Sequence, residues 1–87
     1  MRAVRFNGDS FDEFNRWLEQ NPEVYERIRR LINECRREPF KGIGKPEPLK
    51  GNLRGKWSRR ITDEHRLVYA VTDEQLIIYS LRGHYDE

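Results

Sequence analysis

The sequence predicts an α+β fold in which a helix hairpin packs on one face of an antiparallel, twisted sheet. Two observations support this class. Apolar residues recur at helical spacing between residues 10 and 38, and three strand-like runs, separated by short turns, follow residue 55. A short alternating segment at residues 2–6 precedes the helices. The expected order is therefore β-α-α-β-β-β, and a length of 87 residues predicts a single domain, 1–87.

The first predicted strand, residues 2–6, places Val4 and Phe6 on one side. The first helix is expected to begin at Ser10, because Glu13 follows three residues later in a capping-box pattern. Its large apolar residues fall at helical spacing and are expected to face the core: Phe11, Phe14, Trp17 and Leu18.

The second helix follows almost directly, so the two helices must form an antiparallel hairpin. Asn21 can cap this helix, and Pro22 suits its first position because no N–H is needed there. Cys35 lies on the apolar stripe and is interpreted as a small buried hydrophobic residue rather than a nucleophile. Pro39 ends the helix. The other members of the stripe are Val24, Ile28, Leu31 and Ile32.

Residues 39–55 contain three prolines and four glycines and are predicted to form an ordered loop. Three strands are expected after it, joined by tight turns, at residues 56–61, 65–71 and 75–81. The segment 2–6 is expected to dock beside this meander. The alternation puts Arg66 opposite Leu67 and leaves open which side faces the helices.

Positive charge is concentrated in the middle of the chain. The net charge is +2, but residues 41–70 hold eight basic and three acidic residues. Such a stretch could bind phosphates, or it could simply solvate a loop and strand edges. No apolar run approaches the roughly 20 residues of a membrane span, so we expect a cytoplasmic protein without membrane contact. A single cysteine excludes an internal disulfide.

The residues of this basic stretch could cleave RNA without a metal ion or other cofactor. Cleavage needs a base for the 2′-OH, an acid for the leaving 5′ oxygen and cations for the charged phosphorus centre. Glu47, fixed between Pro46 and Pro48, and the histidines His65 and His84 could exchange protons. The spacing of histidine and cysteine predicts no metal site. The candidate cations are Lys45, Lys50, Arg59, Arg60, Arg66 and Arg82.

Several dense motifs resemble one known family. Gly44-Lys45-Pro46-Glu47-Pro48-Leu49, Trp57-Ser58-Arg59-Arg60-Ile61, Glu64-His65-Arg66-Leu67-Val68-Tyr69 and Arg82-x-His84-Tyr85 are similar to the YoeB (Txe) branch of the RelE superfamily. These are ribosome-dependent mRNA-cleaving toxins of bacterial toxin–antitoxin modules. The resemblance extends over nearly the whole chain in the order of its elements and implies a RelE/YoeB-like fold.

The resemblance also implies roles for individual residues. Glu47 corresponds to the general base, His84 to the general acid, Arg66 to the arginine that stabilises the phosphorane and Tyr85 to the terminal tyrosine of the site. The cations expected to hold the RNA backbone are Lys45, Lys50, Arg59 and Arg60. The implied partners are mRNA in the ribosomal A site, a YefM-like antitoxin and a second copy of the chain in a homodimer.

The chain departs from the family pattern at its end. Gly83 stands where an aromatic residue usually precedes the histidine, and Asp86 and Glu87 follow the tyrosine. Two other functions remain open. A ParE-like gyrase poison would share the fold but lack the Glu47 and His84 set. A non-enzymatic RNA-binding or repressor module would use the basic face alone.

Overall fold

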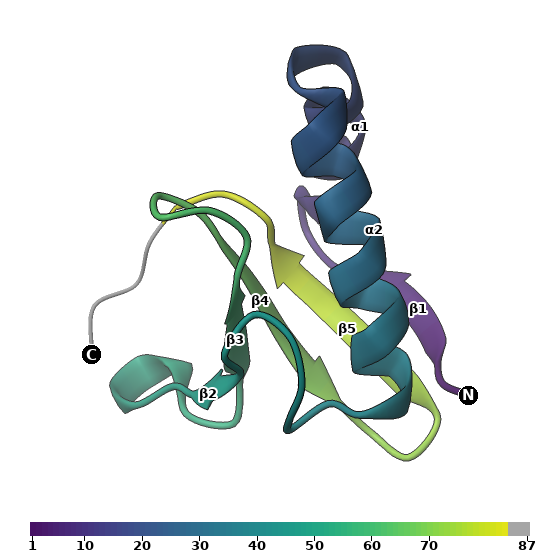
Figure 1. Ribbon diagram of the computed structural model, residues 1–87. Coiled ribbons are helices and arrows are strands. Elements are labelled where there is room, and N and C mark those ends of the chain that lie inside the picture. Colours follow the sequence, from purple (N-terminus) through teal and green to yellow (C-terminus); the bar gives the residue numbers. More distant parts are fainter. Residues whose placement is uncertain (84–87) are drawn as a thin grey trace.

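Five strands form one mixed sheet, and two helices lie against one of its faces (Figure 1). The structure is a computed structural model and describes residues 1–83. The elements in chain order are β1 (Ala3–Phe6), α1 (Ser10–Gln20), α2 (Pro22–Arg37), β2 (Glu47–Pro48), the 3-10 turn η1 (Gly51–Leu53), β3 (Trp57–Arg60), β4 (Arg66–Val71) and β5 (Gln75–Ser80). The predicted order of helices and long strands is confirmed.

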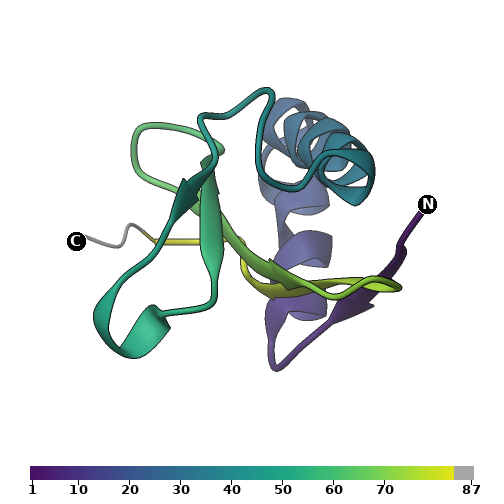
Figure 2. The same ribbon diagram turned by 90° about the horizontal axis from the view of Figure 1, so that it is seen from below.

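The strands lie in the order β1-β5-β4-β3-β2. The predicted docking of the first strand beside the meander is confirmed, since β1 pairs with β5 from Ala3 opposite Gln75 to Phe6 opposite Ile78. This pair is parallel, however, so the expectation of a purely antiparallel sheet is wrong at this edge. Alternation in a sequence determines which face a strand presents, not its direction against a distant strand. Figure 2 shows the twist between β1 and β3.

The first helix begins at the predicted residue for a different reason. Asp9 is the N-cap residue and makes no side-chain cap hydrogen bond. Ser10 is buried, and its hydroxyl donates to the carbonyl oxygen of Ile78 at 3.0 Å. The Glu13 carboxylate accepts from the backbone N–H of Leu81 at 2.7 Å. Both residues of the expected capping box therefore tie the helix to the end of the sheet.

The second helix follows its prediction closely. The Asn21 side chain accepts a hydrogen bond from the N–H of Val24 at 3.3 Å, and Pro22 occupies the first helical position. The buried residues of the helix are Ile28, Leu31, Ile32 and Cys35. In the part of the chain that the structure describes, no helix is long and apolar enough to cross a membrane.

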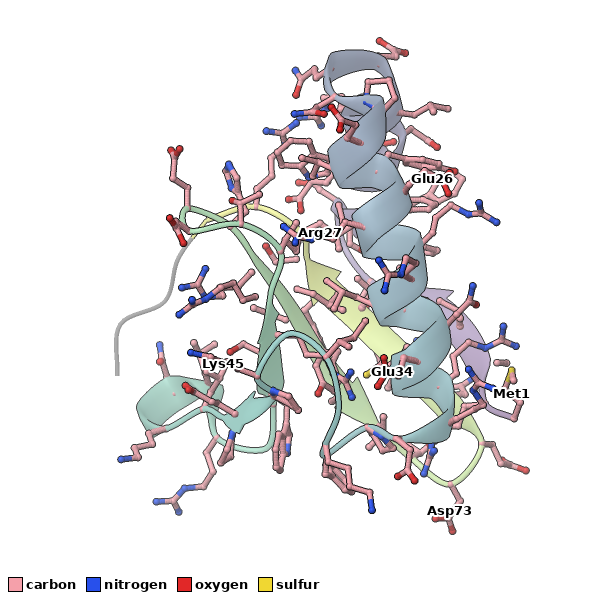
Figure 3. The ribbon with its side chains drawn as sticks, viewed as in Figure 1. Met1, Glu26, Arg27, Glu34, Lys45 and Asp73 are labelled. Atoms are coloured by element: carbon pink, nitrogen blue, oxygen red, sulfur yellow. The ribbon has the colours of Figure 1, made fainter. Side chains whose placement is uncertain are left out.

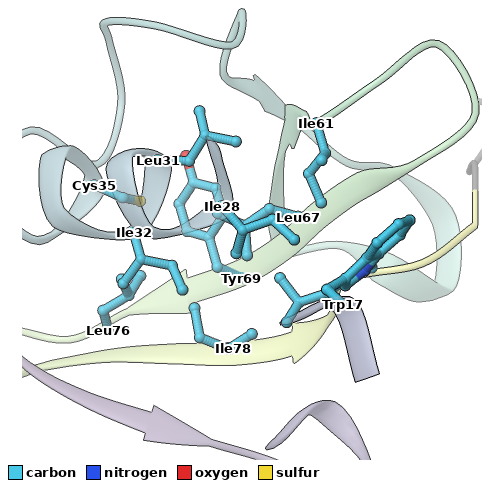
Figure 4. Packing of buried hydrophobic residues seen from close by; sticks show 11 residues of the cluster. Trp17, Ile28, Leu31, Ile32, Cys35, Ile61, Leu67, Tyr69, Leu76 and Ile78 are labelled. Atoms are coloured by element: carbon cyan, nitrogen blue, oxygen red, sulfur yellow. The ribbon is translucent and has the colours of Figure 1, made fainter. Parts of the chain in front are cut away.

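The core lies between α2 and the sheet (Figure 4). Tyr69 and Leu67 of β4 pack there together with Trp17, whose ring N–H donates to the Leu81 carbonyl at 3.0 Å. Phe11 and Leu18 are 53% and 49% exposed, so the expectation that they face the core is wrong. Of the four apolar residues expected to face the core from α1, Trp17 is the one that is buried. The buried stripe of this helix is therefore narrower than the spacing of its apolar residues indicated.

Candidate functional site

Glu47 lies on a short edge strand rather than in the loop predicted from the sequence. Glu47 pairs with Ser58, and Pro48 pairs with Trp57. Pro48 is tolerated because an edge strand does not need its N–H for the sheet. Leu49 continues the pairing, donating from its N–H to the Lys56 carbonyl at 2.9 Å, and its side chain is buried. The carboxylate of Glu47 is thus exposed on a backbone that the sheet holds in place.

The pairing register assigns Glu47 to the face of the sheet away from the helices. Directly opposed residues of antiparallel strands point to the same face. Glu47 opposes Ser58, which in turn opposes Val68. Leu67 and Tyr69 on either side of Val68 belong to the core under the helices. We call the other side, which carries Glu47, the open face.

Two arginines lie on the same open face. Arg60 of β3 opposes Arg66 of β4, two residues along from the pair formed by Ser58 and Val68. Strand spacing then puts the Cα atoms of Glu47 and Arg60 about 8 Å apart. Arg60 is exposed and Arg66 is partly buried. The structure therefore brings a carboxylate and two guanidinium groups to one surface, which the sequence alone left undecided.

The Arg66 side chain is held at one nitrogen. Its Nη1 atom donates to the carbonyl oxygens of Thr62 at 2.6 Å, His65 at 3.1 Å and Asp63 at 3.3 Å. Within residues 1–83 its Nε and Nη2 atoms have no hydrogen-bond partner. An arginine fixed in this way can present its remaining N–H groups to a phosphate without first losing much rotamer freedom.

The backbone of Gly83 is tied to the same corner of the sheet. Its carbonyl accepts from the N–H of Arg66 at 2.9 Å, and its N–H donates to Nδ1 of His65 at 3.0 Å. The His65 ring packs edge-on against Trp17, with ring centroids 5.0 Å apart. Gly83 immediately precedes His84 in the chain. His84 and Tyr85 lie outside the described residues.

Arg59 is not part of this surface, and its expected contact with RNA is wrong. Its side chain is fully buried. Its nitrogens donate to the carbonyl oxygens of Ile43 at 3.1 Å and Lys41 at 3.0 Å, to that of Glu38, and to the Tyr69 hydroxyl at 3.3 Å. Alternation along β3 turns Arg59 inward and Arg60 outward, and Arg59 satisfies the carbonyls that follow α2.

Two ionisable groups of the core, the Cys35 thiol and the Tyr69 hydroxyl, interact with Arg59. Burial raises the pKa of the Cys35 thiol, an effect that the nearby Arg59 partly opposes. Burial also raises the pKa of the Tyr69 hydroxyl, which donates to the Pro39 carbonyl at 2.5 Å. Both groups stay protonated and belong to the packing of the core. The interpretation of Cys35 as a buried hydrophobic residue is confirmed.

The two predicted lysines are exposed. Lys45 has a positive φ of 50° and borders a cavity near the end of β3, and Lys50 precedes η1. Sequence reasoning did not assign Arg27 and Arg30 to any site, yet both line the same cavity as Lys45. Among residues 1–83, no group of three His, Cys, Asp or Glu side chains is placed to hold a metal ion.

A helix pair on a mixed sheet is the architecture that this chain shares with a class of small bacterial toxins. The YoeB/ParE toxin from Agrobacterium tumefaciens superposes with a TM-score of 0.91 and 42% identity, covering 98% of this chain and 100% of that one. A chain of the YoeB-YefM complex from Staphylococcus aureus superposes with a TM-score of 0.87 and 38% sequence identity, covering 98% of this chain and 99% of that one. A chain of the YoeB dimer from the same organism superposes with a TM-score of 0.89 and 38% identity, covering 97% of this chain and 98% of that one.

The chain belongs to the YoeB-like toxin family of bacterial type II toxin-antitoxin systems, whose model matches residues 6–85. Among curated relatives, the toxin YoeB of Streptomyces coelicolor is 52% identical over 82 residues, which is 94% of this chain and 98% of that protein. The toxin YoeB of Escherichia coli K12 is 56% identical over 77 residues, 88% of this chain and 92% of that protein. The resemblance inferred from the motifs is thereby confirmed.

Proposed function

We propose that this toxin is a ribosome-dependent endoribonuclease that cleaves mRNA in the A site and so inhibits translation. The main support is the shared open face, on which Glu47 and Arg66 lie while Gly83 is bonded to Arg66. In the proposed site, His84 follows Gly83 in the chain and acts at the same phosphodiester as Glu47. The function of the family as a toxin agrees with the proposal.

The proposed reaction needs only side-chain chemistry. Glu47 removes the proton of the 2′-OH, and the 2′ oxygen attacks the adjacent phosphorus. Arg66 stabilises the negative charge that grows on the phosphoryl oxygens. His84 gives a proton to the departing 5′ oxygen, and Tyr85 completes the site at the end of the chain. The products are a 2′,3′-cyclic phosphate and a 5′-hydroxyl, and Lys45, Lys50 and Arg60 hold the RNA backbone.

The ribosome is expected to supply orientation. A free RNA strand is expected to adopt many poses on the open face of such a small domain. Holding the ribose and phosphate in line with Glu47 can remove several kcal/mol of the barrier. We therefore expect weak cleavage of free RNA and strong cleavage of mRNA on the ribosome.

The test uses programmed ribosomes and maps the 3′ ends of the mRNA. The wild-type protein should give cyclic phosphate ends, and Glu47→Gln and His84→Gln should each lower the rate at least 100-fold. Glu74→Gln, which changes an exposed carboxylate in the turn before β5, is the matched control and should cleave normally. If Glu47→Gln still arrests growth and binds RNA, the protein is a non-enzymatic RNA-binding module instead.

We propose two protein partners from the solved relatives. A YefM-like antitoxin is the expected inhibitor, since YoeB of Staphylococcus aureus forms a complex with YefM. A homodimer is the expected assembly, since YoeB of the same organism forms a dimer. The half-exposed apolar side chains of this chain, Phe11, Leu18 and Phe40, are candidate contacts for such partners.

A further inference from the structure

A groove with strongly positive walls lies beside the open face. It has a volume of about 660 Å³ and runs between α2, the loop at Ile43 to Lys45 and the end of β3. Figure 3 labels Arg27 on α2 and Lys45 on the facing loop. Four cationic residues line this α2 groove together with one acidic residue, Asp63: Arg27, Arg30, Lys45 and Arg60.

Among the described residues, no ion pair involves the cationic residues of the α2 groove. The one ion pair between residues 1 and 83 joins Arg29 to Glu26, both exposed on the surface of α2. Arg27 instead donates from Nη1 to the Ile61 carbonyl at 2.9 Å, which fixes its guanidinium at the groove. Several like charges around one hollow repel one another, and a polyanionic ligand relieves that repulsion.

The loop wall of the α2 groove is built before any ligand arrives. The N–H of Ile43 donates to the Glu34 carboxylate at 3.2 Å, and the carbonyl of Gly44 accepts from the Arg60 N–H at 2.7 Å. The buried guanidinium of Arg59 holds the Ile43 carbonyl from below. A wall fixed by its own hydrogen bonds costs little conformational entropy when a ligand binds.

The α2 groove adjoins the open face at the end of β3. Arg60 lines the groove and also opposes Arg66 across β3 and β4. Lys45 lines the groove and precedes Glu47 by only two residues. The Arg66 Nη1 atom donates to the carbonyl oxygens of Thr62 and Asp63, and both of these residues line the groove, so the proposed phosphate-binding arginine lies directly beside it.

We propose that the α2 groove is a second RNA subsite, in which Arg27 and Arg30 bind backbone phosphates of the mRNA beyond the cleaved linkage. This inference rests on the proposed nuclease function and extends it. Guanidinium groups suit phosphate because they donate two parallel hydrogen bonds. Ile43 is 39% exposed at the rim and offers an apolar surface to a base. Continuity with Glu47 and Arg66 favours the substrate strand over an acidic peptide.

The experiment measures binding without cleavage. A fluorescent 2′-O-methyl oligoribonucleotide lacks the attacking hydroxyl, so its dissociation constant can be measured with the intact protein over a range of salt concentrations and oligonucleotide lengths. The variants are Arg27→Gln, Arg30→Gln and the double variant. Arg37→Gln is the matched control, because Arg37 lies at the other end of α2 in a separate hollow beside Met1 and Asp73.

The double variant should bind at least 10-fold more weakly than wild type. The slope of log affinity against log salt should fall by about 0.7 for each phosphate contact that is lost. Lengthening the oligonucleotide should strengthen wild-type binding further than it strengthens binding of the double variant. Arg37→Gln should match wild type, and circular dichroism should show all variants folded.

Equal binding and equal salt slopes for the double variant and the Arg37 control would overturn the proposal. Two other outcomes would also overturn it, both with normal binding of the oligonucleotide by the double variant. Loss of antitoxin binding alone would assign the groove to a peptide. Loss of binding to empty ribosomes alone would assign the groove to ribosomal RNA. The proposed catalysis fails separately: wild-type protein that binds as expected but leaves ribosomal mRNA intact refutes the nuclease and not the subsite.

Discussion

The imidazole of His65 accepts a 3.0 Å hydrogen bond at Nδ1 from the backbone N–H of Gly83. This contact joins the turn before β4 to the residue that directly precedes His84. Gly83 has a positive φ of 88°, and this bond adds to the one that its carbonyl accepts from the Arg66 N–H. We therefore expect His65 to be a positioning residue that acts on the proposed acid through the backbone of Gly83.

Replacing His65 should separate its hydrogen bond from its packing. Phe keeps a ring against Trp17 but removes the acceptor, whereas Asn carries an acceptor oxygen close to the position of Nδ1. We expect His65→Phe to lower the cleavage rate on programmed ribosomes about 10-fold or more with little change in substrate affinity. His65→Asn should stay within about 3-fold of wild type, because a misplaced acid slows the chemical step and not binding.

The measurement is the single-turnover rate of mRNA cleavage together with the free energy of unfolding. A merely structural histidine would show the opposite pattern, in which Asn, lacking the ring, is the more damaging change in both quantities. That result would remove His65 from any role in positioning.

Arg59 and Arg60 are neighbours in the sequence, but their substitution should have different effects on the free energy of unfolding. Arg59→Lys should lower the free energy of unfolding by about 3 kcal/mol or more, because an ammonium group cannot reach the Glu38, Lys41 and Ile43 carbonyls together. Arg60→Gln should change stability by less than about 0.5 kcal/mol, since the side chain is exposed. Urea unfolding of both variants checks this, and equal stabilities would contradict the assignment.

Stability should fall in alkali because of Tyr69. Burial raises the pKa of its hydroxyl, so the folded chain keeps this proton at a pH where the unfolded chain releases it. The unfolded state then binds fewer protons, and the free energy of unfolding decreases as pH rises above about 10. Tyr69→Phe should weaken this pH dependence while costing about 1 kcal/mol at pH 7 for the lost hydrogen bonds. Unfolding curves between pH 7 and 11 with identical slopes would refute the assignment.

Gly44 should be far less replaceable than Gly55. Both have a positive φ, 82° and 95°, so alanine strains the backbone at either position. A Cβ atom at Gly44 would lie 2.9 Å from Leu31 Cδ2 and 3.3 Å from the Arg60 carbonyl, whereas nothing lies within 4 Å at Gly55. We expect Gly44→Ala to cost about 2 kcal/mol more than Gly55→Ala in urea unfolding, because a core side chain and a strand must shift. Equal losses in the free energy of unfolding for the two variants would show that the loop around Gly44 can shift to accommodate a Cβ atom.

Local patterns predicted the elements of this fold better than their long-range relations. The stripe on α2 and the alternation in β3 to β5 are local and reappear in the structure. The parallel docking of β1 depends on a partner about 70 residues away, and no local pattern encodes that direction. The two-residue strand at Glu47 escaped prediction because prolines at an edge resemble a loop.

The residues of the candidate site also differ in how well the sequence predicted them. Motifs identified Glu47 and Arg66, and the register then placed both on the open face. Arg59 was misassigned because sequence shows a charge and not which face of the strand it occupies. Arg27 and Arg30 looked like ordinary solvated residues of α2, since the loop that turns their surface into a groove is distant in the chain.

The pairing of the first strand with the last one has a consequence for the timing of synthesis. Ala3 bonds to Glu74, Ser10 to Ile78 and Trp17 to Leu81, so three hydrogen bonds of β1 and α1 wait for residues 74–81 to be made. Contacts this distant along the chain must form late. A growing chain still threaded through the exit tunnel lacks its final strand and cannot yet join Arg66 to Gly83. The sheet therefore closes only once β5 is free to pair with β1.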